Sequence, residues 1–147
     1  MSKESIHLYF LKIAADVASR STCDRASVGA VIVRDKNILA TGYNGSISGT
    51  DHCDDVGHLI ADSHCVRTIH AEINAIIQAA KNGTSIKDSD IYITVFPCWE
   101  CFKVLANVGI KNIYFVEEYR VNELVVRTAR EIGIKLFQGT MSYRLFT

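Results

Sequence analysis

Hydrophobic and polar positions follow two different periods along this chain. Apolar residues recur at helical spacing over residues 6–17, 70–81, 98–108 and 121–132. Short apolar runs typical of strands cover residues 28–33, 38–43, 91–95, 113–116 and 134–137. A polar turn at 34–37 joins the first two strands and predicts a hairpin. Gly109 and Gly133 directly follow two of the helices, where a left-handed C-terminal cap is favoured.

The order of these elements predicts the fold. After the hairpin, strands alternate with helices, which favours parallel pairing through right-handed crossovers. We therefore expect one α/β domain over residues 1–147, with helices on both faces of a five-stranded mixed sheet and the N-terminal hairpin at one edge. Residues 44–63 show no clear period and are rich in Gly, Ser and Asp. A loop of this length in a compact domain usually has a function or is held by something.

Composition narrows the class of protein. A chain of 147 residues with 48% hydrophobic and 22% charged residues is typical of a compact globular domain. The formal net charge is zero, so nothing attracts the whole chain to nucleic acid. Lys12 and Asp16 interrupt the first apolar stretch, which argues against a signal peptide, and no apolar window is long enough to span a membrane. We expect a cytoplasmic protein, or one of the host cytoplasm if it is viral.

Two short segments carry the candidate chemistry. His70-Ala71-Glu72 is followed 24 residues later by Pro97-Cys98-Trp99-Glu100-Cys101. His70, Cys98 and Cys101 offer one nitrogen and two thiolates, which suit a tetrahedral Zn²⁺ with the fourth position left to water. Residues i and i+2 of a helix point to different sides, so we expect the metal off the helix start rather than on its flank. The alternative is that His70 only caps a helix and the cysteines are buried thiols.

These motifs, with Val28-Gly29-Ala30 and Gly42-Tyr43-Asn44-Gly45, resemble the cytidine deaminase-like superfamily and, within it, the deoxycytidylate (dCMP) deaminases. The resemblance covers roughly residues 21–137. It implies the cytidine deaminase-like fold and zinc-dependent hydrolysis of dCMP to dUMP and ammonia, which supplies dUMP for thymidylate synthesis. Glu72 is then the catalytic residue that moves protons. Free-cytidine deaminases usually carry Cys in place of His70, and transfer-RNA adenosine deaminases usually carry Glu in place of Phe96, so both departures argue against those relatives.

The same resemblance implies which residues bind the substrate. Asn44 matches the residue that holds the sugar, although a role as a turn residue stays open. Phe96 and Ala71 are expected near the base, although Phe96 could equally be a core aromatic. The positions that match phosphate contacts are Arg25, His64, Tyr119 and Arg120. Each of these four could instead have a solvated surface role.

Regulation and assembly are also implied by the resemblance alone. Members of the family are commonly hexamers that dCTP activates and dTTP inhibits. Mg²⁺ could accompany a triphosphate effector. The effector site in relatives lies at positions that correspond to Gly42, Tyr43, Asn44, Gly45, Gln78 and Lys81.

The remaining cysteines suggest a second metal site. Cys23, Cys53 and Cys65 lie in or beside the long loop, and His58 lies between the last two. Together they would make a closed four-ligand structural zinc site, which some deoxycytidylate deaminases carry. The alternative is buried free thiols and surface histidines. If His64 binds phosphate, it cannot also be the ligand beside Cys65.

Two other functions compete with this interpretation. A polynucleotide-editing deaminase would share the zinc chemistry but needs a basic, aromatic-lined surface, and the neutral charge balance weighs against it. A non-enzymatic zinc-stabilised module would have no use for Glu72, because a structural zinc takes four protein ligands.

Overall fold

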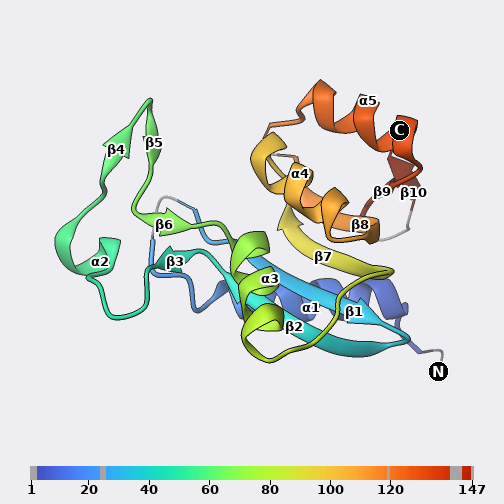
Figure 1. Cartoon of the computed structure of the whole chain (residues 1–147), viewed down its shortest axis with the longest axis horizontal. Helices are drawn as coiled ribbons and strands as arrows, with labels where there is room; N and C mark the ends of the chain where they lie inside the picture. The colour runs from blue at the N-terminus through green and yellow to red at the C-terminus, as the bar shows by residue number, and fades with distance from the viewer. Residues whose placement is uncertain (1–2, 24–25, 119, 140–143, 147) are drawn as a thin grey trace.

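The computed structural model describes residues 3–23, 26–118, 120–139 and 144–146. Its centre is a sheet with the strand order β10-β9-β8-β7-β1-β2 (Figure 1). Strands β7, β8 and β9 run parallel, whereas the pairs β1–β2, β1–β7 and β9–β10 are antiparallel. These strands are β1 (Gly29–Arg34), β2 (Asn37–Tyr43), β7 (Ser89–Val95), β8 (Ile110–Glu117), β9 (Lys135–Gln138) and β10 (Arg144–Phe146).

The predicted α/β fold is confirmed, because all five predicted strands and four predicted helices are present. The helices are α1 (Ile6–Ala18), α3 (Ala71–Lys81), α4 (Trp99–Asn107) and α5 (Glu123–Ile132). In the predicted hairpin turn, Asp35 and Lys36 have φ values of 53° and 64°, the left-handed pair that a two-residue loop favours. Gly133 caps α5 with a φ of 83°, also as predicted. Strand β10 was not predicted, and it extends the sheet at the edge opposite the hairpin.

Successive side chains of β1 point to opposite faces of the sheet, and the core has one layer on each face. Val31 and Val33 pack against α1 in one buried cluster. Ala30 and Ile32 belong to the other cluster, which contains residues of α3, α4 and α5. Helices therefore cover both faces of the sheet, as predicted. Within the described residues, no helix has both the length and the apolar character that crossing a bilayer requires.

Residues 45–69 form an arm that extends to one side of the sheet (Figure 1). The arm contains β3 (Gly45–Ser46), α2 (Cys53–Val56), β4 (Ile60–Ala61), β5 (His64–Cys65) and β6 (Thr68–Ile69). Strand β3 pairs with β6, and β4 pairs with β5. Its larger apolar side chains, Ile47, Val56, Leu59, Ile60 and Val66, are exposed. Hydrophobic burial within the arm is therefore small, and another interaction must hold it.

Candidate active site

Three metal-binding side chains meet where α3 and α4 begin. His70 is the N-cap of α3 and Cys98 is the N-cap of α4, and both have extended backbone. His70 Nδ1 lies 3.5 Å from Cys98 Sγ and 3.3 Å from Cys101 Sγ. Nitrogen and sulfur ligands of a tetrahedral zinc are roughly 3.5 Å apart, given metal–ligand bonds of about 2.0–2.3 Å. The side chains thus converge off the helix starts with a spacing that fits zinc.

The start of α4 favours a thiolate at Cys98. Pro97 stands just before the cap, and Cys98 Sγ accepts a hydrogen bond from the Cys101 N–H at 3.5 Å. This places the sulfur at the positive end of the helix dipole. Hydrogen bonds from the Cys101 thiol and from His70 lower the pKa of Cys98 to about 4, although burial acts in the opposite direction. The start of α4 therefore favours the thiolate form of Cys98, which is the form that binds zinc.

Glu72 lies in the first turn of α3 and is only 4% exposed. Among the Asp, Glu, His, Lys and Arg side chains of the described residues, it is the only one that is buried. Burial raises the pKa of Glu72 above that of an ordinary carboxyl group, and its carboxyl interacts with the Cys101 thiol. A raised pKa makes it easier for a carboxyl group to carry a proton during catalysis.

Gly42 allows α3 to approach the sheet closely enough to form this site. A Cβ atom at Gly42 would lie 2.3 Å from both Ala71 O and Ala75 N, distances that real side chains essentially never show. The absence of a side chain at Gly42 thus lets the first turn of α3 pack directly on the backbone of β2. Ala71 itself is fully buried in this contact.

Asn44 is bound to the segment that precedes β1. Its Oδ1 accepts from Val28 N at 2.8 Å, and its Nδ2 donates to Ala26 O at 2.6 Å. Its backbone oxygen accepts from Thr22 N at 3.2 Å. The side chain is buried and holds the segment before β1, whereas Asn44 is not among the residues with positive φ, so its structural role differs from the left-handed turn residue that the sequence left open. One amide hydrogen and one lone pair remain for a ligand, and sugar binding stays a prediction.

Phe96 packs in the core. Its ring meets Phe115 edge to face, with ring centres 5.0 Å apart, and it is buried between β7 and the start of α4. A contact with a bound base stays a prediction.

Two of the four predicted phosphate contacts, His64 and Arg120, lie within the described residues. His64 is exposed on the β4–β5 hairpin, which projects away from the sheet (Figure 1). Arg120 is exposed between β8 and α5. Arg25 and Tyr119 lie outside the described residues. Phosphate binding by all four stays a prediction.

The predicted effector residues lie in two places, at the end of β2 and the start of β3, and in α3. Gln78 Oε1 accepts from Thr41 N at 2.6 Å, so this side chain already binds the edge of the sheet. Gly45 pairs with Ile69 in the β3–β6 ribbon. Tyr43 and Lys81 are exposed. Gly42 has the packing role described above, and binding of an effector here stays a prediction.

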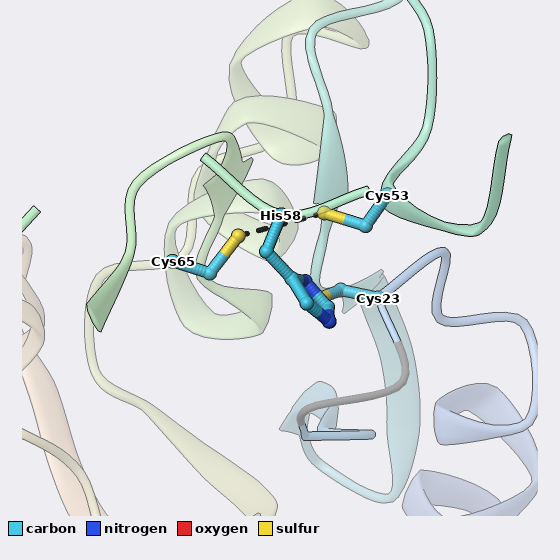
Figure 2. A group of neighbouring side chains, drawn as sticks. All are labelled: Cys23, Cys53, His58 and Cys65. Carbon is cyan, nitrogen blue, oxygen red and sulfur yellow. Dashed lines mark hydrogen bonds between the residues drawn. The ribbon is translucent and has the colours of Figure 1, made fainter. Parts of the chain in front are cut away.

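The four residues predicted for a second metal site do come together. Figure 2 shows Cys23, Cys53, His58 and Cys65 with their side chains directed toward one another. Cys23 Sγ lies 3.4 Å from His58 Nδ1, Cys53 Sγ lies 3.5 Å from Cys65 Sγ, and all four ligand atoms lie within 4.8 Å of one another. The cluster joins the segment after α1 to the arm, which has little core of its own. Four closely spaced S and N donors fit a closed structural zinc site.

One residue with a clear structural role was missed by the sequence analysis. Asn74 Nδ2 donates to Tyr43 O at 2.8 Å and to Ile69 O at 3.3 Å. The signal available in the sequence is a polar residue every fourth position of α3, at His70, Asn74 and Gln78. Such a stripe lies on one side of a helix.

Comparisons with known proteins agree with this site. The model of the cytidine and deoxycytidylate deaminase zinc-binding region matches residues 4–117. The chain is 45% identical over 138 residues to ComE operon protein 2 of Bacillus subtilis (strain 168), covering 94% of this chain and 73% of that protein. It is 34% identical over 151 residues to the deoxycytidylate deaminase of Enterobacteria phage T4, covering 77% and 78%. The crystal structure of the dCMP deaminase from cyanophage S-TIM5 in complex with dCMP and dUMP matches with a TM-score of 0.81 at 31% identity, covering 95% of this chain and 100% of that one.

The fold and the site together define a deaminase of the cytidine deaminase-like class. Its sheet with helices on both faces matches the fold of the S-TIM5 enzyme over 95% of the chain. The chain belongs to the cytidine and deoxycytidylate deaminase family, since that family's model spans most of its length. The resemblance inferred from the sequence is confirmed.

Proposed function

We propose that this protein hydrolyses dCMP to dUMP and ammonia. The observation that carries the proposal is the buried Glu72 beside a cluster of three ligands, His70, Cys98 and Cys101. A purely structural zinc takes four protein ligands and needs no such carboxyl group. The choice of dCMP is supported by relatives that are named deoxycytidylate deaminases and by the S-TIM5 complex with dCMP and dUMP.

His70, Cys98 and Cys101 would hold the catalytic zinc. When bound, zinc would supply a Lewis acid that makes water a nucleophile near neutral pH. Glu72 would take a first proton from the attacking water and deliver it to N3 of the cytosine ring. It would then take the second proton of that water from the new C4 hydroxyl and pass it to the amino group, so that ammonia leaves as the C4 carbonyl forms. Its burial favours this role, because burial raises the pKa of Glu72 and so helps the carboxyl group to hold the proton that it transfers.

Asn44, Ala71 and Phe96 would surround the nucleoside part of dCMP. Asn44 has one amide hydrogen and one lone pair left for a sugar hydroxyl. The 5′-phosphate would be held by some of the predicted cationic and tyrosyl side chains, Arg25, His64, Tyr119 and Arg120.

We also propose that Cys23, Cys53, His58 and Cys65 bind a second, structural zinc. The support is their close spacing and the exposed apolar residues of the arm, which leave a metal as the main source of order there. Control by dCTP and dTTP with Mg²⁺, assembly as a hexamer, dUMP supply for thymidylate synthesis and a cytoplasmic location follow from the family resemblance and stay predictions.

The test is a comparison of ammonia release from four compounds by the purified, zinc-loaded protein. The compounds are dCMP, deoxycytidine, dCTP and a cytosine-containing oligonucleotide. We expect a kcat/KM for dCMP that exceeds the value for deoxycytidine by orders of magnitude, because two or three charge-assisted bonds to phosphate each contribute about 1.5–3 kcal/mol. Preference for the oligonucleotide would instead identify a polynucleotide-editing enzyme. Release from none of the four would indicate a non-catalytic module.

A further inference from the structure

The side chain of Asn74 connects the two chain segments that border the candidate substrate site. Its Nδ2 group donates to Tyr43 O at 2.8 Å and to Ile69 O at 3.3 Å. Tyr43 directly precedes Asn44, the candidate sugar contact, and Ile69 directly precedes His70, the candidate metal ligand. One amide group therefore links the sugar side of the site to its metal side.

The connection adds to two other contacts between β2 and α3, the packing of Gly42 against Ala71 and the hydrogen bond from Thr41 N to Gln78 Oε1. Beyond those residues the two segments pair directly in the ribbon of β3 and β6, in which Gly45 faces Ile69 and Ser46 faces Thr68. A two-stranded ribbon is marginally stable on its own, and this one has only two residues in each strand. Asn44 and His70 continue from the same end of that ribbon, and Asn74 closes this end.

Asn74 is well supported for such a role. It stands on α3, the helix that also carries Glu72, and its backbone N–H donates to His70 O at 3.0 Å. The contact of Gly42 with Ala71 fixes this helix against β2. Both hydrogens of the Asn74 amide point to carbonyl oxygens on the two segments, so a shift of either segment relative to Glu72 breaks a hydrogen bond.

We propose that Asn74 is a positioning residue that sets the distance between Asn44 and the His70–Glu72 end of the site. It acts through the backbone of Tyr43 and Ile69 and contacts no substrate. The inference rests on the proposed function, because it takes Asn44 as the sugar contact. Loss of Asn74 leaves the metal ligands and Glu72 in place but lets the sugar site drift from the base site. The energetic cost then falls on substrate binding.

The experiment compares Asn74→Ala and Asn74→Asp with the wild-type enzyme. For Asn74→Ala we expect KM for dCMP to rise roughly tenfold, which is about 1.4 kcal/mol, with kcat within about threefold and zinc content unchanged. Asn74→Asp keeps the shape but presents acceptors to two carbonyl oxygens, so its KM should rise at least as much. Since deoxycytidine has the same sugar, its kcat/KM should fall by a similar factor. An unchanged KM in Asn74→Ala, or a wild-type KM in Asn74→Asp, overturns the proposal.

A matched control is Asn112→Ala. Asn112 donates one amide hydrogen bond of 2.8 Å to Asp90 between β7 and β8, so its loss tests the effect of a missing amide bond elsewhere in the sheet. We expect a lower Tm for Asn112→Ala but a wild-type KM. An equal rise of KM in both variants would mean general destabilisation and would also overturn the proposal.

If Asn74→Ala does not fold, Asn74→Ser replaces it. A higher KM in this variant supports the inference, and a wild-type KM overturns it. A wild-type enzyme without activity on dCMP would refute the proposed function itself. Activity on dCMP combined with an unchanged KM in the Asn74 variants would refute only the role of Asn74.

Discussion

Replacing Gly42 with alanine would place a methyl group inside the contact between β2 and the first turn of α3. The new Cβ would lie 2.3 Å from Ala71 O and Ala75 N and 2.9 Å from Ala75 Cα. These neighbours are backbone atoms, which cannot rotate away as a side chain can. Normal contacts of 3.3 Å or more require the helix to move by roughly 1 Å. Overpacking of this kind typically costs about 1–3 kcal/mol.

A shift of this size matters for the metal because the first turn of α3 carries His70. Metal–ligand distances must hold within about 0.2 Å, so a displacement of roughly 1 Å relative to Cys98 and Cys101 exceeds the tolerance several times over. We expect Gly42→Ala to lose catalytic zinc, to lower Tm by about 3–10 °C, and to lower kcat/KM by about 10²-fold. Zinc per chain, thermal unfolding and dCMP turnover are the three measurements.

The control for Gly42→Ala is Gly133→Ala. Gly133 caps α5 with a φ of 83° and has no atom within 4 Å of its Cβ position, so alanine there adds backbone strain without a clash. That strain costs about 1–2 kcal/mol and should lower Tm while zinc and kcat/KM stay unchanged. Full zinc and wild-type turnover in Gly42→Ala would refute the argument that this close contact places the ligand.

Four further predictions follow from the site and the core. Glu72→Gln should keep catalytic zinc but lose at least ~10²–10⁴-fold in kcat, because the proton carrier is gone; near wild-type turnover would contradict the mechanism. Cys53→Ser should lower the zinc content from two ions per chain to one, as measured by metal analysis, and make the arm more sensitive to protease. A zinc content of one ion per chain in the wild type would exclude the structural site. Arg120→Ala should raise KM for dCMP and leave the deoxycytidine rate nearly unchanged, and an equal loss on both would exclude a phosphate contact. Burial lowers the pKa of His7 below the ordinary 6.5, so the unfolded chain binds the proton more readily and stability is lost as pH falls below about 6.5. The fall in Tm between pH 7.5 and 5.5 should therefore be smaller in His7→Gln, and an equal fall would contradict this assignment.

Much of the fold and of the candidate site could be predicted because the signals are local. The helix that carries Glu72 and the strand before Pro97 both show a clear pattern of apolar residues. Residues of metal-binding type stand at the start of that helix and just after that strand. The second cluster was predicted because Cys23, Cys53 and Cys65 lie in or beside the long loop and because some deoxycytidylate deaminases carry a second zinc.

The contacts that were missed have weaker signals, such as the polar stripe that contains Asn74, or none at all. Strands β3 and β6 contain two residues each, too few to show a period. The acceptors of the Asn74 amide are backbone carbonyl groups, which every residue has, so no residue type marks them in the sequence. The packing role of Gly42 depends on how closely a helix from another part of the chain approaches, which is a tertiary property.

The hydrogen bonds from α3 to β2 also affect how copies of this protein can meet. Strand β2 lies at the edge of the sheet, and an edge strand with free backbone groups can pair with the edge of another molecule. Here Gln78 occupies the N–H of Thr41, and Asn74 occupies the carbonyl of Tyr43. These two side chains therefore occupy two of the backbone groups through which the edge of β2 could pair with the edge of another molecule.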